Sequence, residues 1–197
     1  MAILGNPPRR RWGARRAGGQ RGWLALGLAL CALMFAAPAG GAPSMEYQVK
    51  AVLLFNFASF VEWPVPARTD SRGPFVIGVL GDDPFGAALD DVVSQETVAG
   101  RSLTVRRFGQ ADGVDACDIL FISRSEARHV PEILRQVQGR PILTVADIPS
   151  FAETGGIIGF STQDGHVRLN INTEAAQSAG LAISSKLLRL ARVVTPQ

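Results

Sequence analysis

The sequence contains few of the residues from which catalytic and metal sites are usually built. Its 197 residues include two cysteines and two histidines. The histidines, His129 and His166, form no His-x-x-x-His pair, and no cysteine pair is present to complete a zinc site, so we interpret both as surface residues. No Gly-x-Ser-x-Gly motif marks the nucleophile of a hydrolase. These absences predict a non-catalytic protein without a metal or a cofactor.

Acidic residues are absent from the first 39 positions, which instead carry six arginines. An apolar run from Trp23 to Ala37 follows the arginines and precedes the small residues APAGGAPS. This order is typical of a secretory signal peptide with its charged, apolar and cleavage regions. The run has fifteen residues, fewer than the roughly 20 that a transmembrane helix needs. We therefore predict a cleaved signal peptide over residues 1–39 and an exported domain over residues 40–197.

Cleavage would change the charge and the cysteine content of the protein. Removing the six arginines changes the formal charge from +3 to −3, so the mature chain lacks the basic surface expected of a nucleic-acid-binding protein. Cys31 would leave with the signal peptide, and Cys117 alone could form no internal disulfide. Because Cys117 begins the apolar run CDILFI, we interpret it as a small buried residue. An intermolecular disulfide or a redox sensor remains the alternative.

Short apolar runs alternate with helix-like segments after residue 44. The patterns predict strands at 75–80, 102–108, 118–123 and 141–145, and helices at 84–95, 125–137 and 149–153. An Asp-Gly turn at 164–165 predicts an antiparallel hairpin, and a long helix is expected over 173–194 with Asn172 or Thr173 as its N-cap. The order predicts a single-domain three-layer α/β sandwich. Its mostly parallel sheet would end in the hairpin and carry helices on both faces.

Charged residues follow three of the predicted strands, in the loops GDDPFG, SRSE and ADIPSF. In α/β sheets such loops, at the carboxyl ends of the strands, line the ligand site. Asp82, Asp83, Arg124 and Asp147 therefore form a possible ligand cleft. A phosphate loop is not indicated, because alanines stand where its Lys and Ser or Thr are required. The structural alternative is that Asp82 or Asp83 caps the following helix and that Arg124 pairs with one of them.

The stretch AVLLFNFASFVEWP, residues 51–64, is unusually rich in aromatic residues. A helix over 49–63 would place six residues in one apolar sector: Val49, Leu53, Leu54, Phe57, Phe60 and Val61. Val52 lies at the margin of the polar side. Phe55 falls on the polar side, and Trp63 also lies at its margin. Both are therefore candidates for partner binding, with ordinary scattered exposure as the alternative for Phe55.

Five segments in order resemble the YfiR-like family of small periplasmic proteins, and the likeness covers residues 46–194. These segments are KAVLLFNFASFVEWP, VIGVLGDDPFGAALD, CDILFISRSE, ILTVADIPSFAETGGIIGF and LNINTEAAQSAGLAISSKLLRLARVV. The resemblance implies a periplasmic protein, often dimeric, that binds the periplasmic sensor region of an inner-membrane diguanylate cyclase and represses it. Cyclic-di-GMP and biofilm formation would then fall. It leaves open other partners, such as sensor histidine kinases.

The chain departs from the family in its cysteines. Relatives commonly carry further cysteines that form disulfides, whereas only Cys117 stands at a matching position here. We therefore expect a non-catalytic periplasmic regulator without an internal disulfide. The alternative is a periplasmic small-ligand-binding domain or an enzyme that uses the cleft at the strand ends.

Overall fold

The computed structural model describes residues 44–64 and 73–195, and the predicted signal peptide lies outside them. The helical elements are α2 (Met45–Phe60), α3 (Ala87–Val93), η1 (Val114–Ala116), η2 (Arg124–Glu126), α4 (Val130–Val137), α5 (Thr173–Ser178) and α6 (Ser185–Leu188). The first strands are β1 (Val61–Glu62), β2 (Phe75–Leu80), β3 (Thr97–Val98), β4 (Arg101–Phe108) and β5 (Ile119–Ile122). The later ones are β6 (Leu143–Ala146), β7 (Ile158–Gln163), β8 (His166–Asn172), β9 (Ala182–Ile183) and β10 (Arg192–Val194).

Eight of these strands form one sheet in the order β10-β8-β7-β6-β5-β2-β4-β3. Strands β4, β2, β5, β6 and β7 run parallel. All residues of β2, β5 and β6 are buried, as expected for apolar runs covered on both faces of a sheet. The predicted α/β sandwich with a mostly parallel sheet is confirmed.

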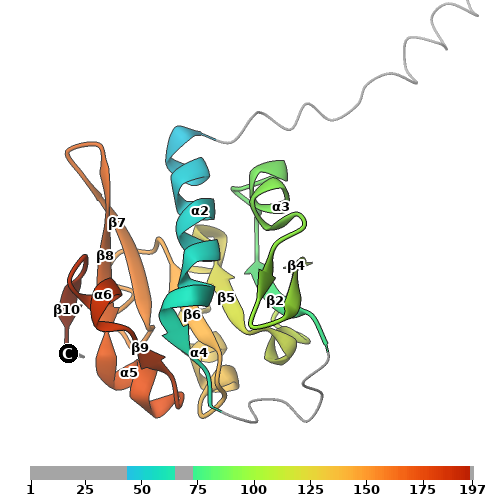
Figure 1. Ribbon diagram of the computed structural model, residues 1–197. Coiled ribbons are helices and arrows are strands. Elements are labelled where there is room, and N and C mark those ends of the chain that lie inside the picture. The colour runs from blue at the N-terminus through green and yellow to red at the C-terminus, as the bar shows by residue number, and fades with distance from the viewer. Residues whose placement is uncertain (1–43, 65–72, 196–197) are drawn as a thin grey trace, which may run out of the picture. The chain divides into compact units, whose positions relative to one another are not determined.

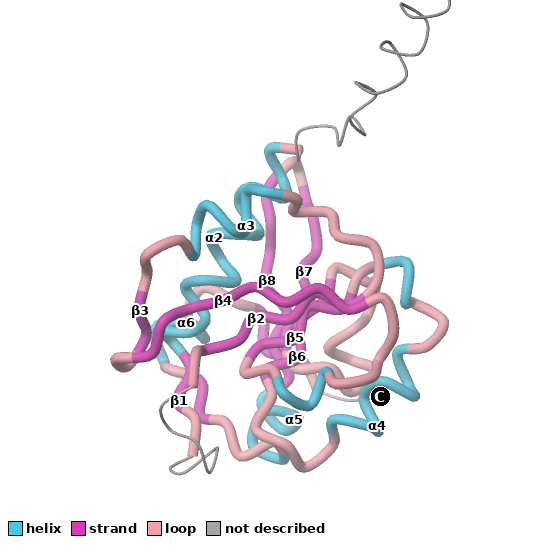
Figure 2. The backbone as a smooth tube through the Cα atoms, turned by 90° about the vertical axis from the view of Figure 1, so that its right-hand side faces the viewer, coloured by secondary structure: helices cyan, strands magenta, loops and turns pink. Residues whose placement is uncertain are grey.

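Two apolar cores lie on opposite faces of the sheet. One contains residues of α2 and α3, such as Phe57 and Leu89, packed on Val79 and Phe121. The other contains Ile133 of α4 and residues of the same strands that point the other way. Helix α2 crosses one face beside α3, while α4 lies on the other (Figures 1 and 2). The alternation of side chains along each strand supplies both cores from one sheet.

The predicted hairpin is confirmed, but it does not end the sheet. Asp164 and Gly165 both have positive φ, 51° and 74°, as a two-residue turn of this kind requires. Strands β7 and β8 are antiparallel, with Gln163 opposite His166. The short strand β10 then pairs parallel to β8 on its outer side.

The prediction of one long helix over 173–194 is wrong. Asn172 is the N-cap as expected, since its Oδ1 accepts the Ala175 N–H at 2.9 Å. Helix α5 ends at Ser178, and Gly180 adopts a positive φ of 72° that turns the chain away. The following residues pair as β9 with β1 and as β10 with β8. Strand pairing with distant segments therefore outweighs the local helical pattern.

Three shorter corrections concern helix boundaries. The predicted helix at 149–153 is wrong, since this segment is a series of turns in which Ser150 has a φ of 56°. The helix expected over 84–95 begins only at Ala87, after Gly86 with its φ of 51°. The helix expected over 125–137 begins at Val130, with Pro131 in its first turn.

Helix α2 buries a different face from the one predicted. Leu54, Phe57 and Val61 are buried as expected, but Leu53 and Phe60 are only half-buried and Val49 is 44 % exposed. The remaining buried positions are Lys50, Ala51 and Ala58. The two alanines let the helix approach the sheet closely, and Lys50 finds a charged partner there. The chain also leaves the helix at Phe60, because Val61 and Glu62 form β1.

Candidate functional site

The first loop of the predicted cleft belongs to a surface ion-pair network. Asp83 Oδ2 accepts a hydrogen bond from Arg107 Nε at 2.7 Å, and Arg107 also pairs with Asp90 at 2.6 Å. The hydrogen bonds to Asp90 and Asp83 raise the pKa of Arg107 above its ordinary value. Asp83 Oδ1 accepts the N–H of Phe85 at 2.8 Å, but α3 itself begins with Gly86 as its N-cap. The predicted helix-capping role is therefore wrong.

The loops that follow β2 and β5 pack closely against each other. Gly81 has a φ of 86°, and a Cβ at this position would lie 2.3 Å from Ser125 Oγ. The Asp82 N–H donates to the same hydroxyl at 3.0 Å. The chain changes direction across the sheet at this point, where α/β proteins commonly bind ligands. Close packing of these two loops weakens the case for a cleft that includes Asp82 and Asp83.

A charged cluster built around a buried ion pair lies instead at the end of β6, and we call it the Lys50 cluster. It comprises Glu46, Tyr47, Lys50, Arg124 and Asp147. Lys50 Nζ lies 2.8 Å from Asp147 Oδ2 and 2.6 Å from Glu46 Oε1, and the side chains of Lys50 and Asp147 are each 1 % exposed. Lys50 is one of two lysines in the whole chain. Its ammonium also lies 4.4 Å from the ring centroid of Tyr47.

Tyr47 and Arg124 complete the surroundings of Asp147. The Tyr47 hydroxyl donates to Asp147 Oδ2 at 2.7 Å, and burial together with this bond raises the pKa of Tyr47 to about 12. Arg124 Nε donates to the Asp147 carbonyl oxygen at 3.1 Å and lies 3.3 Å from Oδ2. Arg124 therefore pairs with Asp147 rather than with Asp82 or Asp83. Asp147 Oδ1 is buried and accepts no hydrogen bond from any residue that the structure describes.

The Lys50 cluster fastens α2 to two other parts of the fold. Lys50 and Tyr47 join α2 to the end of β6, and Glu46 Oε1 accepts a hydrogen bond from Thr162 of β7 at 3.0 Å. Sequence reasoning found Arg124 and Asp147 but missed the three helix residues. The available signal was Lys50 four residues after Glu46 in an otherwise apolar helix, a spacing that favours an ion pair.

The Glu46 carboxylate gives this cluster a testable pH dependence. The hydrogen bond from Lys50 is the main reason why the pKa of Glu46 lies below its ordinary value of 4.5. A lowered carboxyl pKa stabilises the fold above the ordinary pKa, and this contribution is lost as pH falls through the lowered value. Glu46→Gln should therefore be less stable than the native protein at pH 6, and this deficit should shrink at pH 3.

Urea unfolding between pH 3 and pH 7 measures this deficit. The exposed Glu96→Gln provides a carboxyl-to-amide control away from the Lys50 cluster. A Glu46→Gln deficit that stays constant over the whole pH range would contradict the assigned role of the carboxylate.

The outer side of α2 is apolar and exposed. Met45 is 75 % exposed, Val49 44 % and Val52 46 %, and they recur at the spacing of one helix face. Half-buried Phe55 lies at the margin of this face. We call these four residues the α2 outer face. Exposed apolar residues grouped on one face and bordered by polar residues are typical of an interaction site.

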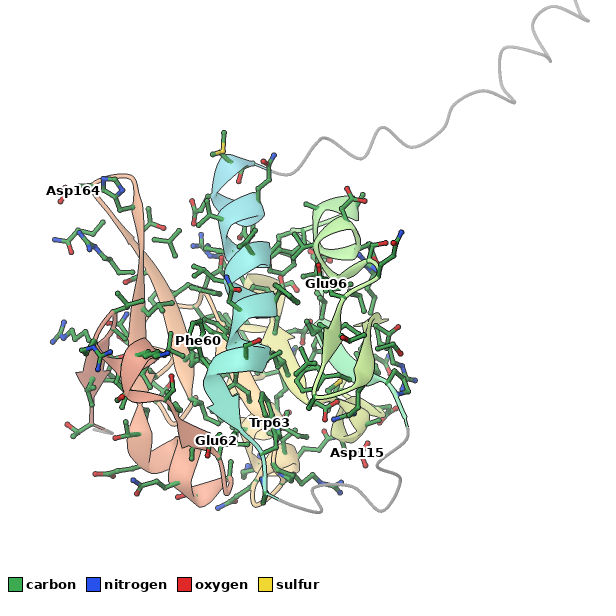
Figure 3. All side chains as sticks on the ribbon, viewed as in Figure 1. Phe60, Glu62, Trp63, Glu96, Asp115 and Asp164 are labelled. Carbon is green, nitrogen blue, oxygen red and sulfur yellow. The ribbon has the colours of Figure 1, made fainter. Side chains whose placement is uncertain are left out.

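The two residues predicted to bind a partner differ in their surroundings. Phe55 belongs to the α2 outer face, at its margin. Trp63 lies beyond the end of α2 (Figure 3). The Trp63 ring packs edge-on against Phe75, with centroids 5.1 Å apart. Its Nε1 is buried and has no hydrogen-bond partner within the described ranges. Val49 was missed because the predicted helix orientation assigned it to the core. Val52 was placed at the margin of the polar side but was not predicted to bind a partner.

Two kinds of feature are absent from the described residues. Within 44–64 and 73–195, no group of three or more His, Cys, Asp or Glu residues is arranged to hold a metal ion. In the same ranges, no helix combines the length and the apolar character needed to cross a membrane.

Comparisons with known proteins give one strong result. A family model described as YfiR/HmsC-like matches residues 47–192. No curated protein matches the chain. Among solved structures, the ABC domain in complex with L-Trp from Streptococcus pneumonia is 16 % identical, with 75 % of this chain and 60 % of that chain covered and a TM-score of 0.47. A conserved domain protein from Vibrio cholerae O1 biovar El Tor is 14 % identical, with 76 % and 60 % covered and the same TM-score of 0.47. Neither structural likeness is close enough to carry a functional argument.

Proposed function

The chain belongs to the YfiR/HmsC-like family, and we propose that it is a non-catalytic periplasmic regulator of an inner-membrane diguanylate cyclase. In this proposal it binds the periplasmic sensor region of the cyclase and holds the enzyme inactive, which lowers cyclic-di-GMP. The match over 47–192, nearly all of the predicted mature domain, is the observation that carries the proposal.

The α2 outer face is the surface that supports partner binding best. Its apolar centre, formed by Val49 and Val52, is flanked by exposed Gln48 and Ser59. Apolar groups at the centre with polar groups at the rim are typical of protein interfaces. The Lys50 cluster holds the opposite side of the same helix in place, so the outer face would need little reorganisation on binding. Phe55 extends this face with an aromatic side chain of the kind enriched in interface centres.

Deletion of the gene tests the cellular role. We expect cyclic-di-GMP and surface attachment to rise, because the cyclase would lose its repressor. Restoring the native gene should reverse both changes. Unchanged cyclic-di-GMP, together with the absence of a copurifying membrane protein, would overturn the proposal.

Substitution of Val52 tests the binding surface. Val52→Glu should weaken binding of the copurified sensor domain by about 10- to 30-fold, as expected when a charge is placed at an apolar interface centre. Phe55→Glu should also weaken binding of the sensor domain. Since Val52 is 46 % exposed, the variant should unfold at the temperature of the native protein. Isothermal titration calorimetry with the purified sensor domain measures the change.

Val193 on β10 offers a matched control because it is also an exposed valine, at 52 %. Val193→Glu should leave sensor binding unchanged. Equal loss of affinity for Val193→Glu and Val52→Glu, or no loss for Val52→Glu, would remove the α2 outer face from the interface.

A further inference from the structure

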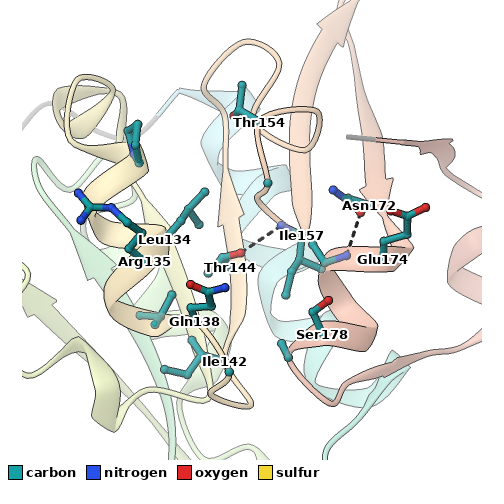
Figure 4. Close-up of a pocket in the computed structure, with 16 residues that line it drawn as sticks. Leu134, Arg135, Gln138, Ile142, Thr144, Thr154, Ile157, Asn172, Glu174 and Ser178 are labelled. Atoms are coloured by element: carbon teal, nitrogen blue, oxygen red, sulfur yellow. Dashed lines mark hydrogen bonds between the residues drawn. The ribbon is translucent and has the colours of Figure 1, made fainter. Parts of the chain in front are cut away.

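A groove lies on the α4 side of the sheet, away from the α2 outer face. Helix α4 forms one wall and α5 the other, and Thr144 and Ile157 form the floor between them (Figure 4). Thr144 belongs to this side because its neighbours Leu143 and Val145 point into the core beneath α2. The groove has a volume of about 510 Å³. This is within the range of roughly 300–1,000 Å³ that is usual for small-molecule sites.

Five uncharged polar residues line the groove. The side chains of Thr154 and Asn172 already bond to the protein, and the other three come from three different elements. The Gln138 amide comes from the end of α4, the Thr144 hydroxyl from β6 and the Ser178 hydroxyl from the end of α5 (Figure 4). Thr144 Oγ1 accepts the N–H of Ile157 at 3.1 Å, so its own hydroxyl hydrogen remains available to a ligand. Together these groups can both donate and accept hydrogen bonds.

Aliphatic side chains form most of the remaining lining near the floor, including Leu134, Ile142 and Ile157. Arg135 and Glu174 also line the groove, one on each wall, and their charges are of opposite sign. A charged ligand that entered between the aliphatic residues would lose hydration without a single dominant countercharge. A ligand with an apolar body and an uncharged amide or hydroxyl group would lose far less hydration free energy on entering the groove.

We propose that the groove between α4 and α5 binds an uncharged small molecule with an aliphatic body and an amide or hydroxyl group. Gln138, Thr144 and Ser178 supply its hydrogen bonds, and Leu134, Ile142 and Ile157 contact its apolar part. The site does not depend on the proposed sensor binding, because no residue of the α2 outer face lines the groove.

N-acetyl-L-leucinamide is a suitable neutral probe, with N-acetyl-L-leucine and L-leucine as its anionic and zwitterionic analogues. Titration of isotope-labelled mature protein, followed by NMR, should shift backbone signals of α4, α5 and β6 with the neutral probe. The two charged analogues should bind at least about tenfold more weakly, because of their desolvation cost. Tighter binding of either charged analogue, or absence of shifts around the groove with the neutral probe, would overturn the proposal.

Two substitutions locate the binding. Ser178→Trp should weaken probe binding at least tenfold by filling the groove, and Gln138→Ala should weaken it about threefold by removing one hydrogen bond. Gln177→Trp is the matched control, since Gln177 is the preceding exposed residue of α5 and does not line this groove. Thermal unfolding of each variant verifies its fold. Equal affinities for the native protein, Ser178→Trp and Gln138→Ala would show that the probe binds elsewhere.

Discussion

Replacing Lys50 by methionine should lower the free energy of unfolding by about 3–5 kcal/mol, the usual cost of removing one partner from a buried ion pair. The ammonium and the Asp147 carboxylate are each 1 % exposed and 2.8 Å apart. Methionine fills similar space but leaves the Asp147 charge buried. Tyr47 and Arg124 also contact Asp147, so we expect the loss to fall at the lower end of this range. Urea unfolding at pH 7 measures the effect.

Two further variants separate the contribution of the ion pair to the free energy of unfolding from the general effect of losing a lysine. Lys186 on α6 is exposed, so Lys186→Met should change the free energy of unfolding by less than about 0.5 kcal/mol. Adding Asp147→Leu to Lys50→Met should cost less than the sum of the two single changes, because no isolated charge remains in the interior. Additive single effects would show that the two charges do not stabilise one another.

Replacing Gly78 by alanine should destabilise the fold by about 1–3 kcal/mol, the usual cost of overpacking a tight core. Gly78 lies in the centre of β2, between β4 and β5. A Cβ at this position would lie 2.4 Å from Cys117 Sγ and 3.1 Å from Phe108 Cε2. The added methyl therefore has no room unless its neighbours shift. Thermal and urea unfolding of the purified variant measure the cost.

The position of Cys117 provides the specific test of this explanation. Cys117 is 3 % exposed, which confirms the interpretation of this residue as buried. In a Cys117→Ala background the sulfur is absent, and Gly78→Ala should cost clearly less. Gly109→Ala is the control, because a Cβ there would meet nothing within 4 Å. A cost of Gly78→Ala that is the same with and without Cys117 would assign the strain to Phe108 or to the backbone.

The features that were predicted correctly depend on residues close together in the sequence. Apolar runs such as 75–80 and 118–123 became buried parallel strands, because a strand covered on both faces needs apolar residues at every position. The Asp164-Gly165 turn formed its hairpin, since these two residues accept the positive φ that the turn requires. Asn172 capped α5 for a similarly local reason, a bond to a backbone N–H three residues away. The family likeness also follows from the order of such local segments.

Several features that were not predicted depend on partners far away in the sequence. The C-terminal segment has the periodicity of a helix, yet residues 182–183 and 192–194 pair with β1 and β8. The face that α2 buries depends on Asp147, which lies 97 residues from Lys50. The hydrogen bond from the Asp82 N–H to Ser125 likewise joins residues 43 positions apart.

Composition, turns and caps could therefore be derived from the chain itself, because their energies arise within a few residues. The orientation of α2, the exposure of Val49, and the groove between α4 and α5 could not be derived in this way. Each is set by packing and charge pairing between segments that are far apart in the sequence.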